Sequence, residues 1–240
     1  AIVRRRVGGG VDDVDAKRFG DRASMGPAPV AVNARTAVPG SDGDGRNRLR
    51  AGYCASQVPE AIELSYCIVN TQQRELLVQC LDAIAAERAS LPFSTEVIVV
   101  DNASTDGSVG AARAHPAVDE VIALEQRAGK GENDTRLLKR ARGRYVLLLN
   151  EDALLEPGAT AALHEELDAD PAAGAAGARL MRPDGRVQPS AWRFPGPATA
   201  IAGAIFLHRR LTVQSRGERT RRVDWVQSSA LLVRREAAAE

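Results

Sequence analysis

From Glu63 onward, short runs of apolar residues alternate with longer segments in which apolar residues recur every three or four positions. Short runs rich in Val, Ile and Leu predict buried strands, and the longer spacing predicts helices that pack on one face. The predicted strands are residues 64–69, 96–100, 120–124 and 145–149, and the predicted helices are residues 74–86, a segment around 137–141, and 157–167. This alternation predicts βα units that build a mainly parallel sheet.

The pattern changes after Asp170. A Pro-Asp-Gly turn separates two short segments, 178–181 and 186–188, and predicts a hairpin. Residues 223–233 predict a further strand. Together these elements predict an α/β fold with a Rossmann-like mixed sheet, mainly parallel, flanked by helices.

Residues 1–60 differ in composition from the rest of the chain. They contain nine Gly and four Pro but few large apolar side chains. Such a segment cannot bury enough apolar surface to offset the entropy that it would lose on ordering. We therefore expect a disordered or poorly ordered lead-in over residues 1–60, with Met25 as an alternative start, and a folded domain over residues 61–240.

Charge and composition exclude several classes of protein. The 32 Lys and Arg residues nearly balance the 31 Asp and Glu residues, which argues against a dedicated nucleic-acid binder. The longest mostly apolar run, residues 198–207, is about half of the ~20 residues that a membrane-spanning helix needs. The three cysteines have neither zinc-ligand spacing nor a disulfide pattern, which favours a cytoplasmic location.

Two common nucleotide-binding motifs are absent from the sequence. No GxGxxG follows the first predicted strand, and Gly129-Lys130-Gly131 lacks the flanking residues of a P-loop. The three His residues have neither metal-ligand nor catalytic-triad spacing. These absences argue against dinucleotide dehydrogenases and P-loop kinases.

The first cluster of polar residues, DNASTDG at residues 101–107, follows the strand 96–100. Ligands of open α/β sheets bind outside the carboxyl ends of the strands, where this cluster lies. We expect Ser104 or Thr105 to cap the next helix and to leave Asp101 free to accept hydrogen bonds from a ligand. An ordinary strand-to-helix turn explains the same residues, and the sequence leaves both interpretations open.

The second cluster, Asn150-Glu151-Asp152, follows the wholly apolar strand 145–149. Carboxylate and amide oxygens suit Mg²⁺ or Mn²⁺, which take one or two protein carboxylates and complete their coordination with phosphate oxygens and water. The alternative is that Glu151 and Asp152 only favour the dipole of the following helix.

Five segments carry a resemblance to a known family. They are SYCIVNTQQRELLVQCLDAI, EVIVVDNASTDGS, ARGRYVLLLNEDALLEPGA, GARLMRPDGRVQPSAWRFP and VDWVQSSALLVRRE. In this order and spacing, over residues 63–239, they resemble the family 2 glycosyltransferases of the GT-A fold, in particular the bacterial rhamnosyltransferase-like branch. The resemblance implies a dTDP-, UDP- or GDP-linked sugar donor, Mn²⁺ or Mg²⁺, and inverting transfer to a hydroxyl of a lipid-linked or cell-surface polysaccharide acceptor.

The resemblance also assigns roles to individual residues. Asp101 is expected to contact the base or ribose of the donor, together with Asn70, Thr71 and Asn102. Asp152 is expected to bind the metal, with Asn150 and Glu151 contacting metal, water or ribose. The acceptor side is assigned to Trp225, Gln227 and Ser228. We expect the Asp101 and Asp152 carboxylates to face one cleft.

The sequence departs from the family pattern at two places. Residues 127–134 (RAGKGEND) stand where the branch usually has Asn-x-Gly-Phe followed by an Asn pair, and Lys130 in this segment either meets a phosphate or is solvated. The family's general base, a carboxylate, is expected beyond Glu240, which predicts an incomplete domain that is inactive by itself. The alternative is a nucleotide-sugar-binding module without catalysis. An acceptor linked to lipid would associate the protein with the inner face of the plasma membrane.

Overall fold

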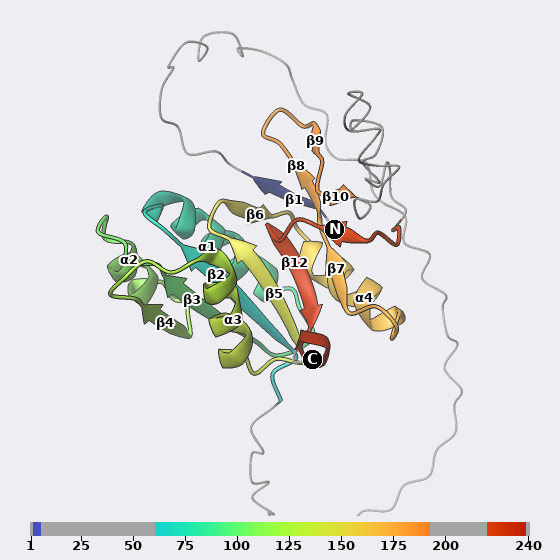
Figure 1. The fold of residues 1–240 in the computed structure, drawn as a ribbon, viewed down its shortest axis with the longest axis horizontal. Helices are drawn as coiled ribbons and strands as arrows, with labels where there is room; N and C mark the ends of the chain where they lie inside the picture. Colours follow the sequence, from blue (N-terminus) through green and yellow to red (C-terminus); the bar gives the residue numbers. More distant parts are fainter. Residues whose placement is uncertain (1, 6–60, 193–219, 239–240) are drawn as a thin grey trace, which may run out of the picture. The chain divides into compact units, whose positions relative to one another are not determined.

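The computed structural model describes residues 2–5, 61–192 and 220–238, and the central feature of this part is a six-stranded sheet (Figure 1). Its strand order is β4-β3-β2-β5-β12-β7. The strands are β2 (Leu64–Asn70), β3 (Thr95–Asp101), β4 (Glu120–Ala123), β5 (Tyr145–Asn150), β7 (Ala175–Gly177) and β12 (Ala230–Arg234). The first four are mutually parallel, and β12 runs antiparallel to both β5 and β7. The predicted mixed, mainly parallel α/β sheet is confirmed.

Helices cover both faces of this sheet. They are α1 (Arg74–Arg88), α2 (Ser108–Ala114), α3 (Lys130–Arg140) and α4 (Ala159–Ala169). The larger apolar core joins one face of the sheet to α1, α2 and α4, and it includes Tyr66, Leu81 and Leu163. The smaller core joins the other face to α3 through Leu137. The central strands are therefore buried on both sides, as their continuous apolar sequences predict.

Two helices begin at residues other than the predicted ones. Helix α2 follows Gly107, which has a φ of 85°, and the carboxylate of Asp106 accepts the N–H of Ser108 at 3.1 Å. Asp106 also accepts the N–H of Arg74 at 2.9 Å, so one carboxylate satisfies amides at the starts of α1 and α2. The prediction that Ser104 or Thr105 caps this helix is wrong, because Asp106 lies closer to the turn.

Helix α4 begins at Ala159, two residues later than predicted. Pro157 precedes the helix, and Gly158 forms the turn with a φ of 79°. The buried carboxylate of Glu87 on α1 accepts the N–H groups of Gly158 and Thr160, each at 2.7 Å. Because Glu87 satisfies amides that a helix start leaves unpaired, the start of α4 is set by a tertiary contact that local sequence does not reveal.

Short strands surround the central sheet. A second sheet has the order β6-β1-β8-β9, and β10 pairs with β11. Their bounds are β1 (Ile2–Arg5), β6 (Ala153–Leu155), β8 (Arg179–Met181), β9 (Val187–Gln188), β10 (Ala191–Trp192) and β11 (Trp225–Val226). The predicted hairpin corresponds to β8 and β9. Strand β1 falls within the predicted lead-in, whose residues 6–60 lie outside the described part of the chain.

The single strand predicted over residues 223–233 is two strands, β11 and β12. They pair with different partners, β11 with β10 and β12 with β5 and β7. The intervening Gln227 donates its backbone N–H to the Ser190 carbonyl at 2.8 Å. The polar residues 227–229 separate the two strands, but they do not show that each strand pairs with different partners.

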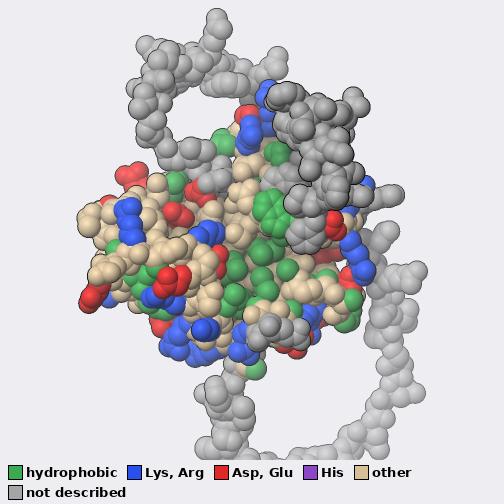
Figure 2. Space-filling model, in the orientation of Figure 1, with side chains coloured by type: hydrophobic (Ala, Val, Ile, Leu, Met, Phe, Trp, Pro, Cys, Tyr) green, Lys and Arg blue, Asp and Glu red, His purple; other side chains and the backbone are tan. Residues whose placement is uncertain are grey.

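Basic side chains gather at the lower edge of the molecule in Figure 2. This is the end of the sheet where β5 begins, opposite the end where it stops at Asn150. Several of these arginines are ion-paired with acids of the same chain: Arg140 with Glu120, Arg142 with Glu96, and Arg144 with Glu63 and Asp168. They hold structural elements together at this end.

No helix among the described residues is long and apolar enough to cross a membrane. The apolar run at residues 198–207 lies outside the described part of the chain.

Candidate functional site

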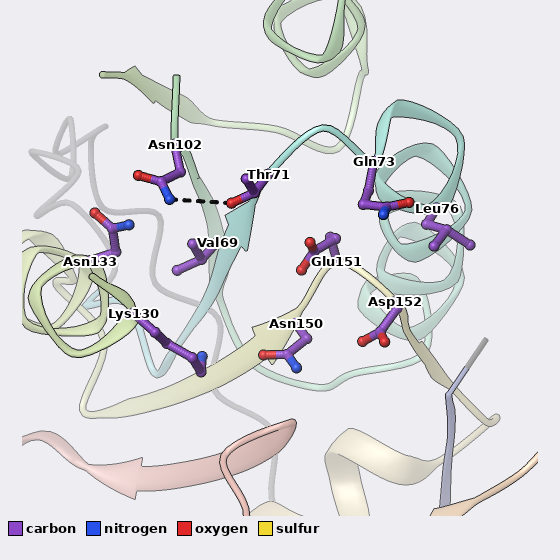
Figure 3. A pocket seen from close by; sticks show the side chains of 10 residues that line it. All are labelled: Val69, Thr71, Gln73, Leu76, Asn102, Lys130, Asn133, Asn150, Glu151 and Asp152. Carbon is purple, nitrogen blue, oxygen red and sulfur yellow. Dashed lines mark hydrogen bonds between the residues drawn. The ribbon is translucent and has the colours of Figure 1, made fainter. Parts of the chain in front are cut away.

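The carboxyl ends of β2 and β5 and the start of α3 border a pocket of about 410 Å³ (Figure 3). The residues that line it are Val69, Thr71, Gln73, Leu76, Asn102, Lys130, Asn133, Asn150, Glu151 and Asp152. Five of these carry a role predicted from the sequence: Thr71, Asn102, Asn150, Glu151 and Asp152. The fold therefore brings the second polar cluster and part of the first together.

Strand register explains this convergence. Strands β2 and β5 are parallel neighbours, and Val69 lies opposite Asn150. Successive side chains of a strand alternate between the two faces, so Asn150 shares the face of Leu148, which packs in the smaller core with α3. Val69 packs against the same core. The pocket thus lies on the α3 side of the sheet, where β5 ends.

Asn150 is held in place by its neighbours. Its backbone N–H donates to the Ser229 carbonyl at 3.1 Å, and its amide Nδ2 lies 3.5 Å from the Ser229 hydroxyl. The Cys80 thiol on α1 contacts the Asn150 carbonyl. Burial raises the pKa of this thiol to about 12, so Cys80 stays protonated and supports the pocket without reacting.

Glu151 and Asp152 give the pocket an acidic end. The backbone N–H of Thr71 donates to the Glu151 carboxylate. Burial and the neighbouring Asp152 charge raise the pKa of Glu151, while its bond to Thr71 and the charge of Lys130 act in the opposite direction. Burial and a neighbouring negative charge disfavour the ionised form of Glu151, and a bound cation would offset both effects.

The donor atoms of this end fit a hard divalent cation. Asn150, Glu151 and Asp152 supply two carboxylates and an amide oxygen beside one pocket. Among the described residues, no group of three or more His, Cys, Asp or Glu side chains forms a complete metal cage. This set fits Mg²⁺ or Mn²⁺ of the kind that completes its coordination with substrate phosphate and water, and it does not fit a structural zinc site.

The opposite end of the pocket carries uncharged polar groups. Asn102 donates from Nδ2 to the Thr71 hydroxyl at 3.3 Å, the bond drawn in Figure 3, and to the Ala128 carbonyl at 3.2 Å. Its Oδ1 accepts the Ala128 N–H at 2.8 Å. The Asn102 amide thus fastens the loop after β4 to the end of β2. The pocket changes along its length from amide and hydroxyl groups to carboxylates.

Asn70 and Asp101 lie next to each other but do not line the pocket. They are neighbours in register on β2 and β3, and both are buried. The Asp101 carboxylate accepts the Asn70 Nδ2 and the Ser104 N–H, both at 2.8 Å. By strand alternation they share the face of Ile68 and Val99, which α1 covers.

Two expectations about Asp101 are corrected by this arrangement. Its carboxylate is engaged in hydrogen bonds within the chain and is not free, and only Asp152 of the two acids borders the pocket. The reason is the alternation of side chains along a strand. Asp101 falls on the face of the sheet that α1 covers, whereas Asn150, at the start of the Asn150-Glu151-Asp152 segment, falls on the face that α3 covers. Contact of Asn70 and Asp101 with a donor nucleotide, which the resemblance implies, stays a prediction, whereas the hydrogen bonds favour a structural role for Asp101.

The predicted acceptor-side residues lie beside the pocket without lining it. Trp225 on β11 is half exposed, with 51% of its surface accessible. Gln227 and Ser228 connect β11 to Ser229, which contacts Asn150 as described above. The segment 227–229 therefore reaches the end of β5. A role of these residues toward an acceptor stays a prediction.

Sequence reasoning gave no role to Val69, Gln73, Leu76 or Asn133. Asn133 is the notable omission, because it is buried and its amide nitrogen and oxygen have no hydrogen-bond partner among the described residues. A usable signal was present in the sequence. Lys130 and Asn133 are separated by three positions, which places them on one helix face.

Comparison with known proteins identifies the family. The model of the family described as glycosyl transferase family 2 matches residues 65–229. The chain belongs to this family. The match spans all ten residues that line the pocket.

A sequence relative lies in the predicted branch. An N-acetylglucosaminyl-diphospho-decaprenol L-rhamnosyltransferase of Mycobacterium tuberculosis is 32% identical over 173 residues, which cover 62% of this chain and 56% of the relative. A putative teichuronic acid biosynthesis glycosyltransferase of Bacillus subtilis is 38% identical over 60 residues, 24% of each protein. The predicted similarity to rhamnosyltransferases is confirmed. The chain spans about half the length of the rhamnosyltransferase that it matches.

A solved structure shares the fold. Mannosyl-3-phosphoglycerate synthase from Rubrobacter xylanophilus matches with a TM-score of 0.50 and 20% sequence identity, covering 73% of this chain and 54% of the other. This similarity supports the predicted GT-A type of fold.

Proposed function

We propose that this chain binds a nucleotide-diphosphate sugar in the pocket and takes part in transferring the sugar, with inversion, to a hydroxyl of a lipid-linked or cell-surface polysaccharide acceptor. The observation that carries the proposal is the Asn150-Glu151-Asp152 segment, which borders the pocket of a family 2 chain together with Thr71 and Asn102. A pocket with one acidic and one uncharged polar end suits a ligand that is itself part polyanion and part nucleoside.

Asp152, with Glu151 and Asn150, would hold Mg²⁺ or Mn²⁺ at the acidic end. Such an ion neutralises the charge that develops on a diphosphate leaving group. The Glu151 bond to the Thr71 N–H connects this end to the loop after β2. Without a cation, the two carboxylates would repel a diphosphate.

Thr71 and Asn102 would meet the nucleoside. Their hydroxyl and amide groups both donate and accept hydrogen bonds, which matches the mixture of donors and acceptors on a base or ribose. Asn102 is already fastened on both sides, to Thr71 and to Ala128, so its position does not depend on the ligand. A wall that is already fixed in place lowers the conformational entropy that the protein loses on binding.

The acceptor half of the reaction is argued from the relative. The name of the M. tuberculosis relative describes a rhamnosyltransferase and a diphospho-decaprenol-linked sugar, which supports a lipid-linked acceptor. Such an acceptor would bring the protein to a membrane surface, which we propose is the inner face of the plasma membrane. Trp225, Gln227 and Ser228 would face this acceptor. Because none of the described residues is assigned as the general base, we separate donor binding from turnover and test donor binding first.

The test is calorimetric titration of the 240-residue chain with UDP, dTDP and GDP, each with and without Mn²⁺. We expect one nucleotide to bind more tightly with Mn²⁺, and Asp152→Ala to remove the metal-dependent part of the affinity. Asp184→Ala, which changes an exposed carboxylate in the β8–β9 turn, is the matched control and should bind as the unchanged chain does. A folded chain that binds none of the three nucleotides under either condition would refute the proposal.

A further inference from the structure

The first turn of α3 borders the pocket. Lys130 is the first residue of this helix, and Asn133 follows one turn later; both line the pocket. No side chain caps the amide groups at this end, since Gly129 occupies the cap position. Added Cβ atoms at Gly129 and Gly131 would meet nothing within 4 Å, so the backbone there is open to approach. Uncapped amides at a helix start attract anions.

Asn133 adds a second, independent observation. Its side chain is fully buried, and within the part of the chain that the structure describes neither Oδ1 nor Nδ2 has a hydrogen-bond partner. A buried amide without partners costs free energy, so its presence is not explained by the stability of the chain alone. Figure 3 shows the side chain at the same end of the pocket as Asn102. A ligand with both acceptors and donors would satisfy it.

Lys130 lies where a cation is unfavourable for the helix. The start of a helix carries partial positive charge, which repels a lysine. Its Nζ lies 3.3 Å from the Asp134 carboxylate, one turn further along, and its side chain is 44% exposed. Figure 3 shows the side chain extended from α3 toward Asn150. It is the single cationic side chain among the ten residues that line the pocket.

We infer that the first turn of α3 is a second phosphate-binding element of the donor site, which holds the diphosphate independently of the metal at Asp152. Lys130 and the first amides of α3 contact phosphate oxygens, and Asn133 donates from Nδ2 to the same group. The Oδ1 atom of Asn133 accepts a hydrogen bond from a ribose hydroxyl of the nucleotide. This inference rests on the proposed function, because it assigns the occupant of the same pocket as a nucleoside diphosphate.

Lys130 must exchange partners when the diphosphate binds. In the ligand-free chain Asp134 holds its ammonium group, and the phosphate competes for the same charge. Removing the Asp134 charge therefore strengthens phosphate binding, whereas removing the Lys130 charge weakens it. Glu132 provides a matched control, because it is an acid of the same helix that pairs with Arg136 instead of Lys130.

The experiment titrates the full chain with UDP, dTDP and GDP in EDTA and again in Mn²⁺. We expect Lys130→Met to weaken metal-free binding of the preferred nucleotide by about tenfold. Lys130→Arg should restore most of this affinity. Asp134→Asn should strengthen metal-free binding by about threefold, and Glu132→Gln should change it by less. Asp152→Ala should remove only the gain from Mn²⁺.

Asn133→Leu provides an independent readout. We expect this variant to unfold at a higher temperature than the unchanged chain and to bind the nucleotide more weakly, because the unpaired amide is replaced by an apolar group of similar volume. An amide with a purely structural role would give the reverse, a lower unfolding temperature with unchanged affinity.

Two results would overturn the inference. One is a Lys130→Met chain that binds the nucleotide as the unchanged chain does, in Mn²⁺ and in EDTA, while Asp152→Ala is deficient; the proposed function would then stand without this subsite. The other is an Asp134→Asn chain that gains no more affinity than Glu132→Gln. If metal-free binding is too weak to measure, the same tenfold loss for Lys130→Met is required in Mn²⁺. Absence of all nucleotide binding would instead refute the proposed function.

Discussion

The carboxyl ends of β3 and β5 carry similar polar clusters but differ in what those clusters do. Asp101 at the end of β3 is 1% exposed and accepts hydrogen bonds from Asn70 and Ser104. Asn150-Glu151-Asp152 at the end of β5 borders the pocket and contains a carboxyl whose pKa is raised. One cluster is satisfied within the chain, and the other carries charge that a ligand would compensate.

The cluster after β3 locks two loops together. Gln72 and Ala103 both have positive φ, 56° and 55°, which is uncommon for residues other than glycine. The Ser104 hydroxyl accepts the Gln72 N–H at 2.9 Å, and the Gln72 Oε1 accepts the Thr105 N–H at 3.1 Å. The Asp101 carboxylate holds these two loops in place by accepting the Ser104 N–H. We infer that its main task is to hold the loops that form the upper wall of the pocket.

The largest effect is expected for Asp101→Ala. This change leaves the Asn70 amide and the Ser104 N–H without a buried acceptor, which should reduce the free energy of unfolding by about 3 kcal/mol. Chemical denaturation measures it. Asp152→Ala is the comparison and should cost far less. Equal losses of unfolding free energy for the two variants would contradict the structural role that we assign to Asp101 alone.

A smaller effect with a defined pH dependence is expected for Glu151→Gln. Because the pKa of Glu151 is raised in the folded chain, its ionised form destabilises that chain at neutral pH. The glutamine variant should therefore unfold at a higher temperature at neutral pH. Its advantage should shrink as the pH falls through the raised pKa and level off below the ordinary carboxyl range. An advantage that grows on acidification would contradict the assigned charge.

Mn²⁺ should reverse the order of stability of the unchanged chain and the Glu151→Gln variant. A cation favours the ionised carboxylate, so metal with nucleotide should stabilise the unchanged chain more than Glu151→Gln. Thermal unfolding with and without both ligands measures the change. Equal stabilisation of the two chains would exclude Glu151 from the metal site.

The smallest effect is expected for Ala103→Gly. Glycine adopts a positive φ without the steric cost that alanine incurs there, and this gain exceeds its added entropy in the unfolded chain. The variant should gain roughly 0.5–1 kcal/mol of stability and retain its affinity for nucleotide. A loss of stability would show that this backbone conformation is not maintained in solution.

The strands and helices of the central sheet were predictable because their signals are local. Runs such as residues 97–100 and 145–149 are apolar and rich in branched side chains, so their structural class is evident. The observed strands extend the predicted 96–100 by one residue at each end and the predicted 145–149 by one residue at its carboxyl end. Strands of two or three residues, such as β6 and β11, carry no repeating pattern. Strand β1 depends on pairing with β6 and β8, far along the chain.

The location of the candidate site was predictable from the sequence, but not all of the residues that line it were. Parallel strands place their carboxyl ends at one edge of a sheet, and this rule correctly predicts that the end of β5 lies near Thr71 and Asn102. The face of each side chain was not predictable, because strands that are buried on both sides lack the alternation of polar and apolar residues that reveals orientation. Asp101 and Asp152 therefore looked equivalent. Asn133 was missed because its significance lies in lacking a partner, which only the fold shows.

The central claim is that Asp152 belongs to a donor site whereas Asp101 belongs to the fold. The most direct measurement determines nucleotide affinity in Mn²⁺ and the free energy of unfolding for Asp152→Asn and Asp101→Asn, side by side. We predict that Asp152→Asn loses metal-dependent affinity with little change in stability, and that Asp101→Asn loses stability while its folded fraction binds nucleotide as the unchanged chain does. A stable Asp101→Asn chain that fails to bind, or an Asp152→Asn chain that binds normally in Mn²⁺, would contradict the account.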